Sequence, residues 1–209
     1  MRVLRRFYHQ WQRLIGLFFC LACLFSMPGC WVFSVNSLYE GNLFGPRDRD
    51  IVFDSNLVGT WKATKDDCVT TLAITSTESP DYVLTYKKDG KRCDTDSERK
   101  ELQFEAKLVK LDSHVFLDVS PKADDVCPSC LAAHQIFLIA LNKDTLNIMP
   151  IDSEWLKDAI EKKKIDVSTV SGNTDILTGS SKELKQFCRD HADDRKVFKP
   201  DPEWLFKRS

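Results

Sequence analysis

The stretch LQFEAKL at residues 102–108 has the pattern on which the fold prediction depends. Leu102, Phe104, Ala106 and Leu108 are apolar, and the residues between them are polar or charged. Strict alternation of this kind is typical of a β-strand with one buried face and one face in water. Strands with a wet face are typical of antiparallel sheets, because parallel sheets are usually covered on both sides.

Similar stretches lie on either side of this strand. They are rich in valine, isoleucine, threonine and aromatic residues, and turn sequences such as Ser79-Pro80-Asp81 and Lys88-Asp89-Gly90 separate them. The pattern predicts an antiparallel meander, because most of the connections are short. Its expected strands are residues 57–63, 69–76, 82–87, 102–108, 115–119, 135–141 and 145–149.

A sheet of this size leaves exposed edges unless it curls shut or is covered. The predicted fold class is therefore mainly β (α+β), an antiparallel meander that closes into a barrel. An eight-stranded barrel encloses either a packed interior or one small ligand, and the sequence leaves both alternatives open. The residues assigned to the interior are large: Trp61, Leu72, Ile74, Phe104 and Leu108.

Two amphipathic helices are expected after the main strands. Asp152 can cap the first helix, and Ser180-x-x-Glu183 forms a capping box at the start of the second. Apolar residues then recur at the three- and four-residue spacing of a helix face. Short strands are expected at residues 165–170 and 175–177, and a final packing strand at residues 203–206.

The sequence Leu57-Val58-Gly59-Thr60-Trp61 at the first strand resembles the opening of a lipocalin. That family has a Gly-x-Trp motif, Gly59-x-Trp61 here, on the first strand of a closed eight-stranded barrel. The resemblance implies that Trp61 plugs the barrel base and stacks under a basic residue near the C-terminus, for which Lys207 and Arg208 are candidates. It also implies a lipocalin-like domain that binds a small apolar ligand.

The N-terminal residues resemble a bacterial lipoprotein export signal. Four arginines, the last of them Arg13, precede an apolar run from Leu14 to Val35, and this run contains Met27-Pro28-Gly29-Cys30. The resemblance implies a signal peptide over residues 1–29 and a lipid attached to Cys30. The protein would then be located in the cell envelope, lipid-anchored to a membrane on its periplasmic or outer face.

Other interpretations of this segment remain open. Cys23, which follows Leu21-Ala22, is a second candidate for the lipid, and plain secretion is a third possibility. The apolar run is also long enough to span a bilayer as an uncleaved anchor, although Pro28-Gly29 disfavours a helix. We expect residues 30–50 to form a tether and residues 51–209 to form a single domain. The aromatic residues of the tether either sit at the lipid headgroups or cover one edge of the domain: Trp31, Phe33, Tyr39 and Phe44.

The charge balance argues against a nucleic-acid partner. Residues 1–29 hold four of the 30 basic residues and no acidic residue, so the remainder carries 26 basic against 31 acidic residues. A mildly acidic body with interspersed charges lacks the basic patch that nucleic acid requires. The expected partners are the membrane, through the N-terminal lipid, and a small apolar ligand or another envelope protein.

The cysteines predict disulfides, the usual state in an exported protein. If residues 79–82 form the tip of a hairpin, Cys68 lies opposite Cys93. Cys127-Pro128-Ser129-Cys130 is expected to form a local bridge. The alternative is a metal or thiol site built on Cys127, Cys130 and His134, with a fourth ligand from His114 or Cys188. Cys188 lies on the apolar stripe of the second helix and is expected to be a buried thiol.

The sequence predicts a non-enzymatic protein without a cofactor or metal. It has no serine in a Gly-x-Ser-x-Gly context and no glycine-rich loop that could cradle a phosphate. We expect His114 to lie on the surface, His134 to end a strand, and His191 to interact with the C-terminal dipole of its helix.

Overall fold

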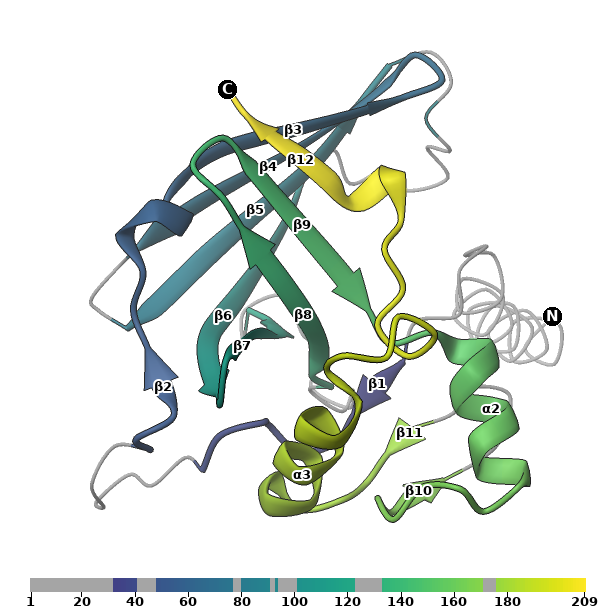
Figure 1. The fold of residues 1–209 in the computed structure, drawn as a ribbon. Helices are drawn as coiled ribbons and strands as arrows, with labels where there is room; N and C mark the ends of the chain where they lie inside the picture. Colours follow the sequence, from purple (N-terminus) through teal and green to yellow (C-terminus); the bar gives the residue numbers. More distant parts are fainter. Residues whose placement is uncertain are drawn as a thin grey trace, which may run out of the picture. The chain divides into compact units, whose positions relative to one another are not determined.

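The computed structural model describes residues 32–40, 48–76, 80–90, 93, 101–122, 133–170 and 176–209 (Figure 1). These residues belong to one compact unit, Trp31–Ser209. The predicted signal peptide, the lipid attachment at Cys30 and the bridge between Cys127 and Cys130 lie outside the described residues.

Eight antiparallel strands form a closed barrel, which confirms the predicted fold class. They pair in the order β6-β5-β4-β3-β12-β9-β8-β7, and a further pairing of β6 with β7 closes the ring. The strands are β3 (Gly59–Lys65), β4 (Cys68–Ser76), β5 (Asp81–Asp89), β6 (Leu102–Leu111), β7 (His114–Pro121), β8 (Gln135–Leu141), β9 (Thr145–Pro150) and β12 (Leu205–Arg208).

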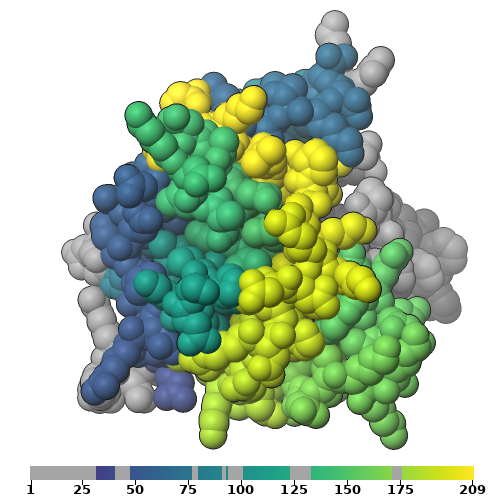
Figure 2. Space-filling view, in the orientation of Figure 1, coloured from purple at the N-terminus to yellow at the C-terminus, as the bar shows by residue number. Residues whose placement is uncertain are grey.

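The first and last strands of the barrel each adjoin a short 3-10 helix. Residues Ser55–Leu57 form η1 just before β3, so the first strand starts at Gly59 and Leu57 lies outside it. Residues Pro202–Trp204 form η3 just before β12. The expected packing strand at residues 203–206 is therefore displaced toward the C-terminus, and it inserts between β3 and β9. Figure 2 shows the C-terminal residues (yellow) running as a continuous band toward the barrel strands.

Two apolar cores lie on opposite faces of the barrel wall. Successive strand residues point to opposite faces, so in β7 Leu117 belongs to the interior core and Phe116 to the outer core. In β8 Phe137 and Leu138 divide in the same way. Four of the residues predicted for the interior are buried there, and Phe104 is half-buried against them.

The outer core lies beneath two helices and a small sheet. The helices are α2 (Ser153–Glu161), which is capped by Asp152, and α3 (Ser181–His191), which starts with the predicted capping box. The sheet contains β1 (Phe33–Ser34), β11 (Ile176–Leu177) and β10 (Thr169–Val170), in that order. Figure 1 shows these elements gathered on one side of the barrel, away from β3 and β4.

The described part of the predicted tether is packed against the barrel. Val32 and Leu38 are buried in the outer core, and β2 (Ile51–Val52) pairs with β6. The expectation that the domain begins at residue 51 is therefore wrong, because apolar side chains well before that point contribute to its core. The half-buried Tyr39 packs against the outer core, which matches the alternative in which aromatic residues of the tether cover an edge of the domain.

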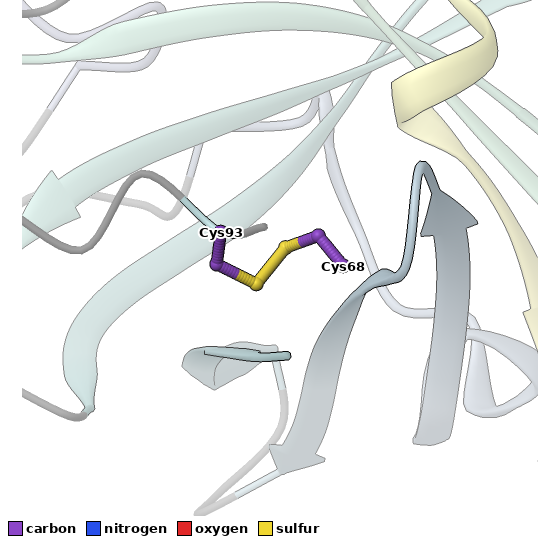
Figure 3. Close-up of a disulfide and its surroundings, with 2 residues drawn as sticks. All are labelled: Cys68 and Cys93. Atoms are coloured by element: carbon purple, nitrogen blue, oxygen red, sulfur yellow. A yellow bond between two sulfur atoms is a disulfide. The ribbon is translucent and has the colours of Figure 1, made fainter. Parts of the chain in front are cut away.

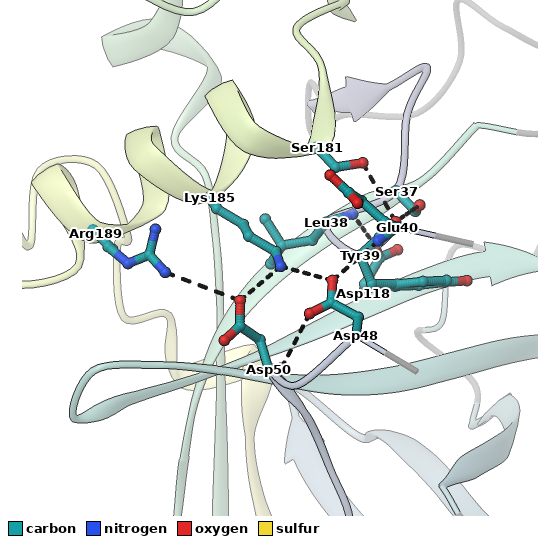
Figure 4. A network of polar contacts seen from close by, with 10 residues as sticks. All are labelled: Ser37, Leu38, Tyr39, Glu40, Asp48, Asp50, Asp118, Ser181, Lys185 and Arg189. Atoms are coloured by element: carbon teal, nitrogen blue, oxygen red, sulfur yellow. Dashed lines mark hydrogen bonds and ion pairs between the residues drawn. The ribbon is translucent and has the colours of Figure 1, made fainter. Parts of the chain in front are cut away.

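An ion-pair network joins α3 to the chain that precedes β2 (Figure 4). The Lys185 ammonium lies 2.7 Å from Asp48 and 2.6 Å from Asp50, and Arg189 lies 4.0 Å from Asp50. Burial opposes charge in the lysine, but its hydrogen bonds to the two carboxylates raise the pKa of Lys185. The network thus fixes the helix against the edge of β6.

The predicted disulfide between Cys68 and Cys93 is confirmed, although the register that suggested it is wrong (Figure 3). In the β4–β5 hairpin Ser76 lies opposite Tyr82 and Val69 opposite Asp89, so Cys68 falls opposite Gly90 rather than Cys93. Gly90 has a φ of 144°, and a Cβ there would lie 2.2 Å from the carbonyl oxygen of Asp67. The glycine therefore allows the chain to pass close to the β3–β4 turn and bring Cys93 to Cys68.

Candidate functional site

The base of the barrel is the end at which Trp61 and Arg208 meet. Trp61 is fully buried, and the Arg208 guanidinium carbon lies 4.1 Å from the centroid of its ring. Arg208, one of the two predicted candidates, thus makes a cation–π contact with the motif tryptophan. The guanidinium also donates to the carbonyl oxygens of Asn56, Val58 and Lys143, and the last two bonds are both 3.1 Å long.

Gly59 makes this arrangement possible. Its φ is 146°, which L side chains rarely adopt, and a Cβ at this position would lie 2.7 Å from an Arg208 nitrogen. Leu57 is the last residue of η1, and its carbonyl oxygen accepts a 2.9 Å hydrogen bond from the Trp61 indole. The two motif residues therefore seal the base together with η1 and the arginine.

The far end of the barrel, which contains the β3–β4 turn, is lined by aromatic rings. Trp204 reaches it because β12 runs antiparallel to β3 from the far end to the base. Its indole lies 6.5 Å from the Tyr86 ring and 6.1 Å from the Phe137 ring, and both pairs are nearly parallel. Tyr86, Phe104 and Trp204 belong to the interior core but are only half-buried, unlike Trp61 at the base.

A buried carboxylate holds residues 32–40, which we call the strap, against the outer core. Asp118 on β7 is 2% exposed. It accepts a 2.5 Å hydrogen bond from the backbone N–H of Leu38, and its other oxygen lies 2.7 Å from Nδ1 of His134. The pKa of Tyr39 on the strap is raised to about 12, mainly by burial and also by the negative charge of Asp118. The tyrosine hydroxyl is therefore neutral at physiological pH.

Sequence reasoning missed Asp118. The available signal was a single acidic residue inside the apolar strand VFLDV at residues 115–119. A buried carboxylate needs hydrogen-bond donors, and those of Asp118 come from Leu38 and His134, which are distant in the sequence. His134 directly precedes β8, close to its expected place at a strand end.

Replacing Asp118 by alanine should lower the free energy of unfolding by about 1–3 kcal/mol, because the buried N–H of Leu38 loses its acceptor. Chemical denaturation would measure the loss. The matched control is Asp158→Ala, since the Asp158 side chain is half exposed and its ion pair with Lys162 lies at the surface. Equal midpoints for the two variants would show that Asp118 does not hold the strap.

The remaining candidate residues are placed apart. The Nε2 atom of His114 lies 3.1 Å from a carboxylate oxygen of Asp193, and the His191 ring packs 4.9 Å from Phe187 at the end of α3. Cys188 is fully buried, as expected, and burial raises the pKa of its thiol. Within the part of the chain that the structure describes, no group of three or more metal-ligating side chains comes together. The alternative metal site is not tested, because Cys127 and Cys130 lie outside that part.

Comparison with protein-family models, with curated proteins and with solved structures found no match for this chain. In the described residues, no helix is both long enough and apolar enough to cross a membrane.

Proposed function

We propose that this chain is a non-enzymatic lipoprotein of the cell envelope, anchored by a lipid at Cys30, whose barrel binds one small apolar ligand through its far end. The observation that carries the proposal is the difference between the two ends of the barrel. Trp61, Arg208 and η1 close the base, whereas inward-facing aromatic rings at the far end are only half-buried. Binding sites of small barrels lie in their mouths and are lined by apolar and aromatic side chains.

The same arrangement supports a lipocalin-like domain. The Gly59-x-Trp61 motif lies on the first barrel strand, and a basic residue near the C-terminus stacks on the tryptophan. Both features are those that the resemblance implied. The disulfide between Cys68 and Cys93 supports export, because such bonds persist in oxidising compartments. We assign a structural role to the Asp118–His134 pair, since it holds the strap.

The binding proposal is tested by titrating the purified protein with hexadecanoic acid and with a neutral lysophospholipid while recording tryptophan fluorescence. Trp204 at the far end is the reporter. We expect a saturable change that a Tyr86→Arg variant weakens at least about tenfold, because a charge would replace an apolar wall. The matched control is Thr85→Arg, at the adjacent position on β5, which should bind as the parent does because its side chain faces outward.

A second candidate function is a protein-interaction module that scaffolds other envelope components. The observation that favours it is the number of large side chains that fill the interior and are less than 2% exposed, among them Trp61, Tyr82, Leu117 and Phe206. A barrel filled along its whole length would leave no room for a ligand. In the titration it would give no saturable response with either probe, which would contradict the binding proposal.

A further inference from the structure

The small sheet presents an apolar row on its outer face. Phe33 on β1 pairs with Ile176 on β11, which pairs with Val170 on β10. Residues paired across strands point to the same face. The neighbouring pair, Ser34 and Leu177, is buried in the molecule, at 1% and 0% exposure. Phe33, Ile176 and Val170 therefore face outward from the sheet, and their exposure rises from half-buried at Phe33 to 56% at Val170.

Three large apolar side chains of the described residues are exposed, and Val170, at the end of this row, is the most exposed of them. The other two, Leu205 at 45% and Phe53 at 42%, lie on β12 and just after β2. Phe53 stacks on Tyr82, at a centroid distance of 5.4 Å. Val170, by contrast, continues an apolar row at the edge of a sheet. A contiguous row of this kind points to a contact surface.

The strap fixes the sheet rigidly to the start of the domain. Ser34 and His134 exchange two backbone hydrogen bonds of 2.8 Å, and the N–H of Val35 donates to Leu177 over 2.9 Å. Further along the strap, the backbone N–H of Leu38 donates a hydrogen bond to the buried Asp118 carboxylate (Figure 4). Hence no flexible tether separates the first strand of the sheet from the body of the domain.

The distance along the chain from the proposed lipid to this sheet is short. Phe33 follows Cys30 by three residues, so their Cα atoms lie at most about 10 Å apart. Paired strands are spaced by about 4.8 Å, which places Val170 only about 10 Å beyond Phe33. Apolar side chains on a membrane-associated surface enter the boundary between headgroups and acyl chains to a depth of about 5–10 Å.

We propose that the outer row Phe33–Ile176–Val170 rests in the surface of the bilayer that holds the Cys30 lipid, so that the domain has a fixed orientation on the membrane. The inference rests on the proposed lipid attachment. It goes beyond anchoring, because an anchor alone leaves the orientation of the domain free. Phe33 lies near the bilayer in either case, so Val170 on the distal strand is the position that distinguishes the two.

The test is the accessibility of a spin label in the full, processed chain, reconstituted into vesicles of phosphatidylethanolamine and phosphatidylglycerol. The label is attached to Val170→Cys or, as a matched control, to Leu205→Cys on the barrel wall. Wild-type protein treated with the same reagent gives the background from native cysteines. Collision of the label with a water-soluble nickel complex and with oxygen, which concentrates in lipid, is then measured. Intact mass of each sample reports whether Cys30 carries its lipid.

We expect the label at residue 170 to lose accessibility to the nickel complex and gain accessibility to oxygen, while the label at residue 205 remains accessible to the nickel complex. Equal, water-like values at both positions with the lipid intact would overturn the contact surface alone. A sample without lipid at Cys30 would overturn the anchor and, with it, this inference.

Discussion

The Trp61→Ala variant is expected to lose about 3–5 kcal/mol of its free energy of unfolding, the usual cost of removing a buried large aromatic side chain. Trp61 is fully buried at the barrel base, where its ring lies under the Arg208 guanidinium and its indole nitrogen donates to Leu57. Truncation would leave a cavity and an unpaired carbonyl group. Chemical denaturation followed by circular dichroism would measure the loss.

The matched control for this variant is Leu205→Ala, on the strand that pairs with β3. Leu205 is 45% exposed, so its truncation should cost far less. A difference of less than about 1 kcal/mol between the two variants would show that Trp61 does not fill the base. The resemblance to a lipocalin would then lose the residue on which it depends.

The second large effect concerns the disulfide. Replacing both Cys68 and Cys93 by serine should lower the free energy of unfolding by about 3 kcal/mol, because the bridge joins two residues 25 positions apart in the sequence and so restricts the unfolded chain. The comparison is between the double variant and the oxidised parent protein in the same denaturant series.

Peptide mapping without reduction checks the same bond directly. It should recover Cys68 linked to Cys93, while Cys188 reacts with an alkylating reagent only after unfolding, because that thiol is fully buried. A peptide that links Cys68 to Cys188, or free thiols at both Cys68 and Cys93, would be incompatible with the arrangement of β4 and β5.

Alternating and periodic patterns predicted the elements well because they report directly on which faces are buried. The barrel strand at residues 102–108 and the capping box at Ser180 and Glu183 both appear where their local patterns placed them. The register of the β4–β5 hairpin could not be predicted in this way. It depends on the turn conformation, and the positive φ of Gly90 then carries the chain beyond the strand to Cys93.

The start of the domain was predicted incorrectly for a related reason. Glycine, asparagine and proline in residues 31–50 are typical of a linker, and nothing local reveals that Leu38 is buried against distant helices. The partners of Asp118 were equally hidden, since they lie 80 residues before it and 16 residues after it. Long-range pairing of this kind is visible only in the folded chain.

Native mass spectrometry of the full chain, purified from membranes, tests the central claim most directly. The account predicts a mature protein that begins at a lipid-modified Cys30 and retains a small apolar molecule, which is released when the barrel unfolds. A Cys30→Ser variant should lack the covalent lipid but keep the apolar molecule. A mature mass unchanged by that substitution, together with a barrel that carries no ligand, would contradict the account.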